Sequence, residues 1–402
     1  MKRSALLFLA SVLAMPALSA DLPETSPEQV GMSSRRLSRL SDSLDDYIQR
    51  GELPGAVTVI ARRGRLVHFD VQGFRDLDAK KPMTRDTVFQ IRSMTKPITS
   101  VAVMMLFEEG RFLLNDPISK FLPEFAHPKV VASPSEGANP SGPNTIPADR
   151  QITIRDLLAH TAGYDYSVRD DADEPIAEYS RKLARQPLKY HPGTAWSYST
   201  GTHVLVSLVE EISGQSFDEF LSERIFQPLG MKDTTYYVPE DKIERLAIPY
   251  TGTESGALQA LGSARETRGS KVRFGGANGL YSTAGDYLRF ATMLLNGGRH
   301  GGQSLLSRKT IDLMTANHVG DFSLNRHLGG YRFGLGFRVM TDLGRAAILS
   351  SPGEFGWAGS YGSYFWIDPR EEMVGIFMTH KRPMPAHIML AVHTLANQAI
   401  TE

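Results

Sequence analysis

Phe89-Gln90-Ile91-Arg92-Ser93-Met94-Thr95-Lys96-Pro97 is the stretch on which the interpretation of this chain depends. It places a serine and a lysine three residues apart, at the predicted start of a helix. The apolar run 101–107 continues that helix, and Gly110 is a typical C-terminal stop. Positions i and i+3 share one face of a helix, so the Lys96 amine is expected beside the Ser93 hydroxyl.

A serine and a lysine at this spacing suit nucleophilic catalysis. A serine hydroxyl is a weak nucleophile until a base takes its proton. A lysine serves as that base where burial or a neighbouring cation lowers its pKa, and the apolar helix would supply the burial. Chance alone gives about one or two Ser-x-x-Lys matches in a chain of this length. Lys96 is the only lysine that follows a serine at this distance.

The composition is that of an ordinary globular protein. The 402 residues are enough for one large or two medium domains, with 41% hydrophobic and 22% charged residues. Basic and acidic residues number 44 each, which argues against a nucleic-acid partner because such proteins carry a basic excess. The chain contains no cysteine, which excludes disulfides, thiolate catalysis and cysteine metal sites.

Residues 1–20 are predicted to be a secretory signal peptide. Lys2 and Arg3 form the positive region, residues 5–18 the apolar region, and the small residues 17–20 a cleavage site. The mature chain is therefore expected to begin at Asp21 and to be periplasmic or secreted. No later stretch is long and apolar enough to span a bilayer.

Strand-like and helical patterns occupy different parts of the chain. Two strand-like runs, 56–61 and 66–71, predict an early hairpin, and further strands are predicted at 334–339, 361–367 and 373–378. Helical patterns dominate the middle. We therefore predict an α+β fold in which both chain ends build one antiparallel sheet flanked by helices. The α/β lobe would hold about 21–92 and 320–402, and a mainly helical lobe about 93–319, in one catalytic domain, 21–402.

Three short motifs occur in a familiar order: Ser93-Met94-Thr95-Lys96, Tyr198-Ser199-Thr200 and Trp357-Ala358-Gly359. Together they resemble the serine β-lactamase and penicillin-binding-protein superfamily, in its class C-like branch. The segments 157–163, 279–283 and 364–369 also resemble that branch. The resemblance covers essentially the whole mature chain and implies a β-lactamase/transpeptidase-like fold.

The resemblance also implies a role for each motif residue. Ser93 would be the acylated nucleophile, and Lys96 and Tyr198 would share the general-base work. The backbone N–H groups of Ser93 and Ser360, the latter just after Gly359, would form the oxyanion hole. The family uses no metal or cofactor for this chemistry, and His160 would have a structural role at a helix end.

Two positions depart from the β-lactamases. Thr200 stands where they carry an asparagine that helps hold the substrate amide, and Trp357 stands where they carry the lysine of Lys-Thr-Gly. The second change removes a cation, and it resembles the family VIII carboxylesterases. A cleft lined by the Ser93 helix, the Tyr198 loop and an edge strand near Trp357 is expected to bind short neutral esters.

Other functions remain open on the same residues. A class C-like β-lactamase, a D-amino-peptide hydrolase and an acyltransferase would all use an acyl-enzyme on Ser93. A catalytically silent binding protein of the cell envelope is the alternative from another class. The Gly-x-Ser-x-Gly motif of the α/β-hydrolases is absent, which counts against a Ser-His-Asp triad.

Overall fold

The computed structural model describes residues 21–132, 144–168, 174–253, 256–322, 324 and 329–402. The predicted signal peptide, 1–20, lies outside the described residues. Among the residues described, no helix has the length and apolar character needed to cross a membrane.

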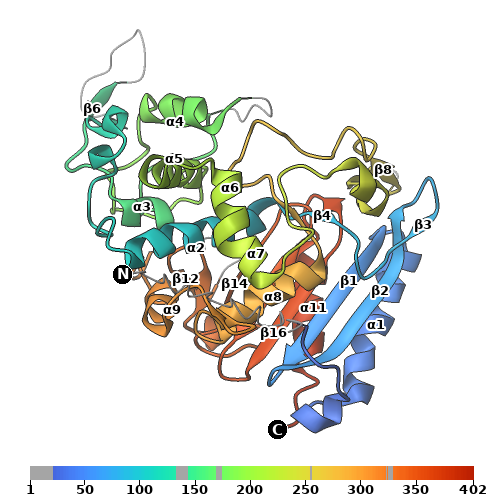
Figure 1. Cartoon of the computed structure of the whole chain (residues 1–402). Helices are drawn as coiled ribbons and strands as arrows, with labels where there is room; N and C mark the ends of the chain where they lie inside the picture. Colours follow the sequence, from blue (N-terminus) through green and yellow to red (C-terminus); the bar gives the residue numbers. More distant parts are fainter. Residues whose placement is uncertain (1–20, 133–143, 169–173, 254–255, 323, 325–328) are drawn as a thin grey trace, which may run out of the picture.

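The two ends of the chain build one antiparallel sheet, as predicted. In the described residues it has eight strands in the order β12-β13-β14-β15-β16-β1-β2-β3, and β1 pairs with β16. Figure 1 shows this junction, where the blue N-terminal strands lie alongside the red C-terminal ones. The strand bounds are β1 Gly55–Arg62, β2 Arg65–Asp76, β3 Lys81–Pro82, β12 Tyr331–Phe333, β13 Arg338–Met340, β14 Phe355–Ala358, β15 Tyr364–Asp368 and β16 Met373–Met378.

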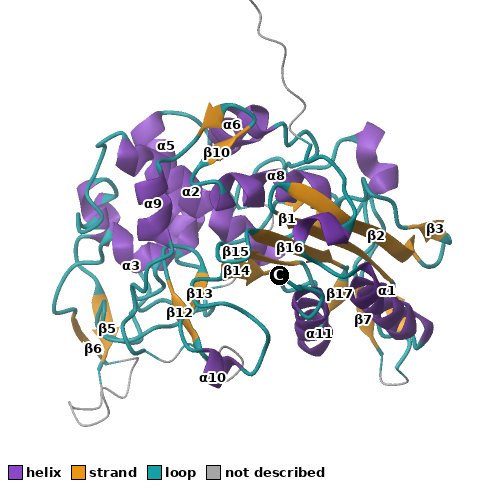
Figure 2. Ribbon diagram, turned by 90° about the horizontal axis from the view of Figure 1, so that it is seen from below, coloured by secondary structure: helices purple, strands orange, loops and turns teal. Residues whose placement is uncertain are grey.

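Helices cover both faces of this sheet. Helices α1 (Ser34–Gln49) and α11 (Ala386–Asn397) pack together on one face, and α8 (Ala284–Leu295) packs on the other. Figure 2 shows the two sets on opposite sides of the strands. Strands β1, β15 and β16 are therefore buried on both faces, whereas β2 is only partly buried. Ile60, Trp366 and Phe377 belong to the core beneath α1 and α11.

The middle of the chain is mainly helical. Helices α2 and α5 lie at its centre and bury almost all of their side chains, which explains their near-continuous apolar sequences. The bounds of the helices here are α2 Thr95–Glu108, η3 Ile118–Lys120, η4 Pro123–Phe125, α3 Ile154–Leu158, α4 Ile176–Ala184, α5 Thr202–Ser213, α6 Phe217–Leu221, the π-helix η6 Ser222–Phe226, α7 Gln227–Leu229, η7 Glu240–Arg245 and α9 Arg308–Met314.

Short strands and single turns complete the described structure. The bounds are η1 Pro27–Val30, β4 Phe89–Gln90, η2 Arg92–Met94, β5 Lys129–Val131, β6 Thr145–Pro147, β7 Tyr250–Gly252, β8 Leu258–Ala260, β9 Tyr281–Ser282, β10 Arg299–His300, β11 Gln303–Ser304, α10 Leu343–Ala346 and β17 Lys381–Arg382.

Local sequence signals fix several helix ends. The hydroxyls of Ser33, Thr153, Thr283 and Ser307 each accept a backbone N–H of the first turn of their helix. Ser216 occupies the N-cap position of α6, but its side chain accepts no such bond. The chain continues from α6 through the π-helix η6 instead of forming one regular helix.

Two expectations for the C-terminal strands differ from the structure. The predicted strand 334–339 is confirmed only at 338–339, where β13 begins, and residues 334–337 form a turn between β12 and β13, because Gly336 adopts a φ of 94°, which favours glycine. The strand that carries Trp357 was expected at an edge of the sheet. It is the interior strand β14, because β12 and β13 extend the sheet beyond it, although β13 pairs only with Phe355 and Gly356 and not with Trp357.

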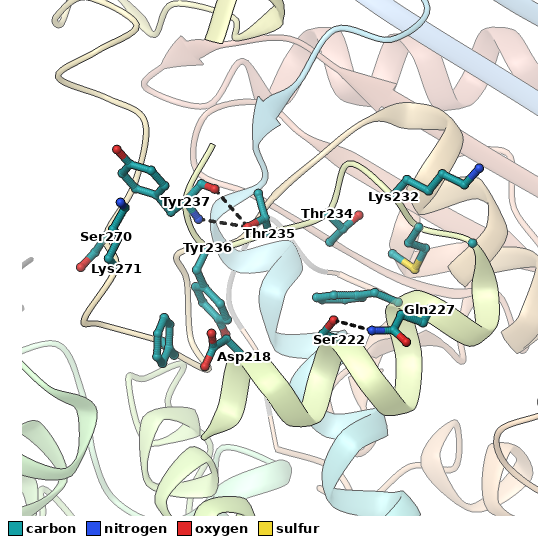
Figure 3. A pocket seen from close by; sticks show the side chains of 14 residues that line it. Asp218, Ser222, Gln227, Lys232, Thr234, Thr235, Tyr236, Tyr237, Ser270 and Lys271 are labelled. Atoms are coloured by element: carbon teal, nitrogen blue, oxygen red, sulfur yellow. Dashed lines mark hydrogen bonds between the residues drawn. The ribbon is translucent and has the colours of Figure 1, made fainter. Parts of the chain in front are cut away.

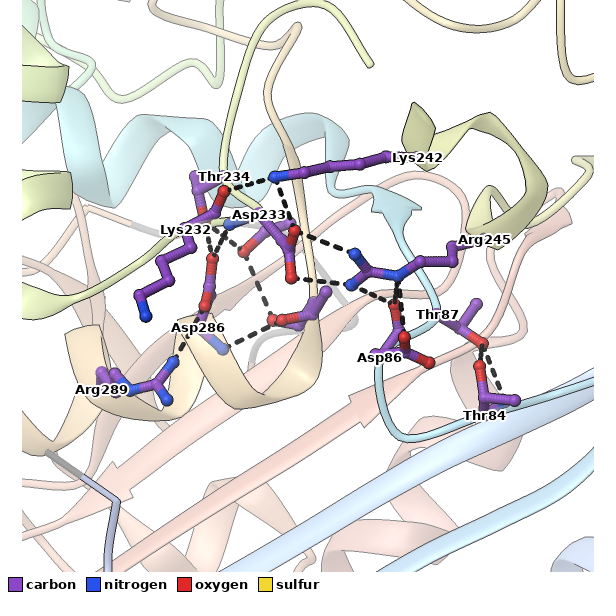
Figure 4. A network of polar contacts seen from close by, with 12 residues as sticks. Thr84, Asp86, Thr87, Lys232, Asp233, Thr234, Lys242, Arg245, Asp286 and Arg289 are labelled. Atoms are coloured by element: carbon purple, nitrogen blue, oxygen red, sulfur yellow. Dashed lines mark hydrogen bonds and ion pairs between the residues drawn. The ribbon is translucent and has the colours of Figure 1, made fainter. Parts of the chain in front are cut away.

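A polar network ties the segment before η7 to the sheet side of the molecule (Figure 4). The Asp233 carboxylate pairs with Arg245 at 2.7 Å and with Lys242 at 2.8 Å. The Asp286 carboxylate, at the start of α8, accepts the backbone N–H of Asp233 at 2.7 Å. Arg245 also pairs with Asp86, just before β4, so this network holds the approach to the Ser93 stretch in place.

Buried histidines make the stability of this fold depend on pH. Burial is the main reason why five histidines have a lowered pKa, and it lowers the pKa of His380 to about 3. The set is His68, His160, His203, His318 and His380. The unfolded chain takes up these protons near pH 6.5 and the folded chain only at lower pH. These neutral histidines therefore stabilise the folded state fully above about pH 6.5. Their contribution to the free energy of unfolding is lost as the pH falls towards their pKa values in the folded state.

We therefore expect the urea midpoint to be lower at about pH 5 than at about pH 7, with up to about 1.4 kcal/mol lost per histidine per pH unit. The carboxyls of Glu210, Asp286 and Asp368 have raised pKa values and act in the opposite direction, but they are fewer. Urea titrations across this range test the expectation, and an unchanged midpoint would contradict it.

Candidate active site

Ser93 lies at the junction between a short strand and the central helix. Strand β4 pairs with β9, and the Ile91 N–H donates to the Leu280 carbonyl at 3.0 Å. The chain then turns through η2, which contains Ser93, and enters α2 at Thr95. Ser93 is half-buried, so its hydroxyl is held on a rigid element at an accessible position.

Lys96 is buried one turn further along, with only 2% of its surface exposed. Its Nζ donates to the Ala277 carbonyl at 2.9 Å and lies 4.5 Å from the centre of the Tyr198 ring. The Tyr166 hydroxyl is 3.5 Å from the same nitrogen. The amine therefore contacts a carbonyl oxygen and two aromatic rings.

Tyr198 contacts the third motif directly. The Trp357 indole Nε1 donates to the Tyr198 Oη at 3.0 Å, and the two ring centroids are 5.1 Å apart. A hydrogen bond donated to a phenol oxygen stabilises that oxygen when it loses its proton. The tryptophan that replaces the lactamase lysine therefore acts on the same tyrosine that the sequence predicts as a base.

The third motif is also packed tightly against the Ser93 stretch. A Cβ on Gly359 would lie 2.3 Å from the Ile91 carbonyl oxygen, so the two backbones approach as closely as glycine permits. The Ser363 hydroxyl donates to the same carbonyl at 3.0 Å. Among the described residues, the Ser360 N–H donates to no protein acceptor. The structure thus brings Ser360 next to the Ser93 turn.

Thr200 is placed differently from the other predicted residues. It is buried, and its Oγ1 accepts from the Tyr179 hydroxyl at 3.0 Å and donates to the Asp165 carbonyl at 3.1 Å. These bonds hold the loop after Tyr198 against α4. A contact between Thr200 and the substrate, as predicted from the sequence, would have to form while both bonds are kept. That contact stays a prediction.

Two groups near Lys96 were missed by sequence reasoning. Tyr166 follows closely after the 157–163 segment, which was its only signal, and the Ala277 carbonyl had none. Desolvation, and to a lesser extent the neighbouring Tyr198, raise the pKa of Tyr166, although 52% of the residue's surface is exposed. Tyr166 is therefore poorly suited to give up its proton.

His160 packs beneath the site without entering it. Its ring lies 4.9 Å from that of Tyr198 and 5.1 Å from that of Phe333. Burial, and to a lesser extent the Lys96 charge, hold the pKa of His160 well below its usual value. The imidazole is therefore neutral near pH 7, which agrees with the structural role implied by the resemblance.

A cavity of about 600 Å³ lies away from these residues, between the α6–α7 segment and the chain at 270–274. Figure 3 shows Asp218, Ser222 and Gln227 on the helical wall, and Tyr236 and Tyr237 on the facing chain. None of the predicted site residues lines it.

Known proteins resemble this chain in sequence and in fold. An uncharacterized protein of Mycobacterium tuberculosis is 36% identical over 366 residues, covering 85% of this chain and 89% of its own. Esterase EstB of Burkholderia gladioli is 29% identical over 363 residues, covering 82% and 89%. The solved structure of EstCE1, a hydrolase with promiscuous acyltransferase activity, superposes with a TM-score of 0.76 at 25% identity, covering 90% and 98%.

The family model described as Beta-lactamase matches residues 40–397, which is most of the chain. Its span includes the three motifs and both halves of the large sheet. The chain therefore belongs to the beta-lactamase family, within the serine β-lactamase and penicillin-binding-protein superfamily.

Proposed function

We propose that this protein is an exported serine hydrolase that cleaves short-chain neutral carboxylic esters through an acyl-enzyme on Ser93. The observation that carries the proposal is the 3.0 Å bond from the Trp357 indole to the Tyr198 hydroxyl, beside the buried Lys96. Through this bond the third motif still donates to the oxygen of Tyr198, the proposed base, although it lacks the lysine of the β-lactamases. The likeness to Esterase EstB supports the same reading.

In the acylation step the Ser93 Oγ attacks the ester carbonyl carbon, and its proton passes to the Lys96–Tyr198 pair. The Lys96 cation and the Trp357 N–H stabilise the Tyr198 oxygen while it lacks a proton. Collapse of the tetrahedral intermediate breaks the bond to the alcohol oxygen, which takes the proton from the pair. Water then attacks the acyl-enzyme by the same steps in reverse order.

The carbonyl oxygen needs donors where its negative charge develops. The N–H groups of Ser93 and Ser360 would supply them, because the close contact of Gly359 with Ile91 holds the two segments together. Removing one such donor typically costs about 10²–10³ in kcat.

Aromatic side chains form the wall next to Tyr198. The partly exposed Trp196 stacks on Tyr198 at 6.3 Å, and the largely buried Trp357 packs at 5.2 Å on the buried Phe333 behind them. An apolar wall of this kind contacts a short acyl chain favourably, whereas the carboxylate of a penicillin gains no charge-assisted bond from it.

We expect p-nitrophenyl butyrate to be hydrolysed with a kcat/KM at least about tenfold above that for nitrocefin. The reason is that nitrocefin carries a carboxylate, and a desolvated carboxylate without a partner costs about 1–3 kcal/mol. Steady-state rates on both substrates test this. Trp357→Lys should raise the nitrocefin-to-butyrate ratio and Trp357→Phe should not, since phenylalanine removes the donor without adding a cation. A parent enzyme that prefers nitrocefin would overturn the proposal in favour of a β-lactamase.

Acyl transfer is the second candidate. The likeness to EstCE1, at 25% identity over 90% of this chain, supports it, because the acyl-enzyme can pass its acyl group to an alcohol instead of water. The ratio of transfer product to free acid, measured with a primary alcohol added to the ester assay, decides between the two.

A further inference from the structure

The Lys96 amine is held by a segment of chain that is distant in sequence. Its Nζ donates to the Ala277 carbonyl at 2.9 Å. Ala277 belongs to the segment 275–280, which precedes β9 and forms no helix or strand itself. A carbonyl on such a segment can fix an amine only if other contacts fix the segment. The question is therefore what holds residues 275–280 in place.

Thr99 supplies one such contact from the same helix as the lysine. It lies three residues after Lys96 in α2, so the two side chains share one face of the helix. Its side chain is fully buried, and its Oγ1 donates to the Gly276 carbonyl at 2.9 Å. The Thr95 carbonyl, which is the usual acceptor within a helix, is further away at 3.2 Å. The Thr99 hydroxyl thus joins α2 to the residue before Ala277.

The same segment is pressed against α5 on its other side. A Cβ on Gly276 would lie 2.6 Å from Val206 Cγ2 and 2.7 Å from the Thr202 carbonyl oxygen, so only glycine fits there. The Ala277 N–H donates to His203 Nδ1 at 3.4 Å. The segment therefore lies between α2 and α5, and its two successive peptide groups are bound from opposite sides.

We propose that Thr99 is a positioning residue for the reaction: its hydroxyl fixes the segment 275–280 and, through the Ala277 carbonyl, the Lys96 amine beside Tyr198. This inference rests on the proposed chemistry at Ser93. The amine lies 4.5 Å from the centre of the Tyr198 ring, and its electrostatic support of that tyrosine depends on this distance. A displacement of about 1 Å in an active site can cost about 10²-fold in rate.

Thr99→Val removes the hydroxyl and keeps nearly the same side-chain shape. We expect kcat for p-nitrophenyl butyrate to fall about tenfold while KM stays close to that of the parent, because the amine is displaced and the substrate wall is not. Thr99→Ser keeps the donor and should recover most of the parental kcat. Steady-state kinetics on the three proteins measure this, with the fraction of active enzyme counted by fluorophosphonate labelling.

The pH profile separates positioning from general damage. A displaced Lys96 cation supports Tyr198 less when the tyrosine loses its proton. The pH at which kcat reaches half of its maximum should therefore be higher in Thr99→Val than in the parent. A loss of kcat that is equal at every pH would contradict the proposal, because it would indicate only a smaller amount of folded enzyme.

A double-mutant cycle shows whether Thr99 acts through Lys96. In the Lys96→Ala background, Thr99→Val should change kcat by less than about twofold, because the amine that the segment holds is already absent. Thr310→Val is the matched control in the parent background. Thr310 is also a buried threonine, and its hydroxyl donates to Glu108 at the far end of α2. Its variant should keep the parental kcat and pH profile.

The outcomes distinguish this inference from the function on which it rests. A parental kcat in Thr99→Val, or a tenfold loss that persists in the Lys96→Ala background, overturns the role of Thr99 alone. If Thr99→Val does not fold, Thr99→Ala takes its place in every comparison, since its smaller side chain cannot clash.

A parent enzyme that turns over nitrocefin and no ester refutes the esterase, and the same cycle measured on nitrocefin then tests Thr99. If neither substrate is turned over, the esterase is refuted as well, and the rate of fluorophosphonate labelling at Ser93 replaces kcat in the cycle. A parent that is not labelled either overturns both proposals.

Discussion

Replacing Ser93 with alanine is expected to lower kcat for p-nitrophenyl butyrate by about four to six orders of magnitude, as loss of the nucleophile does in serine hydrolases. The reason is that no other group can take the acyl chain: the neighbouring bases Lys96 and Tyr198 would be left without a hydroxyl to activate. Labelling by a fluorophosphonate, which adds a fixed mass to an activated serine, should disappear in the same variant.

Ser38→Ala is the control for this measurement. Ser38 is exposed on α1 and donates to the Arg35 carbonyl at 3.0 Å, far along the chain from the site. Its variant should keep parental turnover and labelling. Near-parental turnover in Ser93→Ala would remove the nucleophile assignment, and a label found at another serine would show where the activated hydroxyl is.

The sequence predicts the fold well where local patterns and long-range packing agree. The strand-like runs at both chain ends predicted one sheet, and β1 does pair with β16. Element boundaries were predicted wrongly where the backbone conformation overrides the preference of the residues. The turn around Gly336 interrupts an apolar run because a positive φ is needed there. The π-helix after α6 likewise has no marker that separates it from a regular helix.

The site was predictable as a set of side chains but not as a set of contacts. The motif order named Ser93, Lys96, Tyr198 and Trp357, and the structure joins the last three through the Lys96–Tyr198 and Tyr198–Trp357 contacts. The Ala277 carbonyl that accepts from Lys96 escaped prediction because every residue carries such a group, and folding alone brings this one across 181 positions.

Lys96→Ala and Tyr198→Phe are each expected to lower kcat/KM for p-nitrophenyl butyrate by about 10²–10⁴-fold, the range for loss of a positioned acid or base. Lys96 lies against the Tyr198 ring and Trp357 donates to the Tyr198 oxygen, so proton transfer requires the two residues together. The double variant should therefore be little worse than the more damaged single one, because residues that act as a unit are strongly non-additive.

Tyr166→Phe provides the matched comparison, because the Tyr166 hydroxyl also approaches Lys96, at 3.5 Å, yet its raised pKa makes it a poor proton donor to that amine. Its loss should be much smaller than that of Tyr198→Phe. Because the Trp357 indole donates to Tyr198, removing that donor in Trp357→Phe should weaken the base and lower kcat more than it raises KM. Two outcomes would mean that the proton does not move through the Lys96–Tyr198 pair. One is a double variant whose loss in kcat/KM equals the product of the two single losses, and the other is a Tyr166→Phe defect as large as that of Tyr198→Phe.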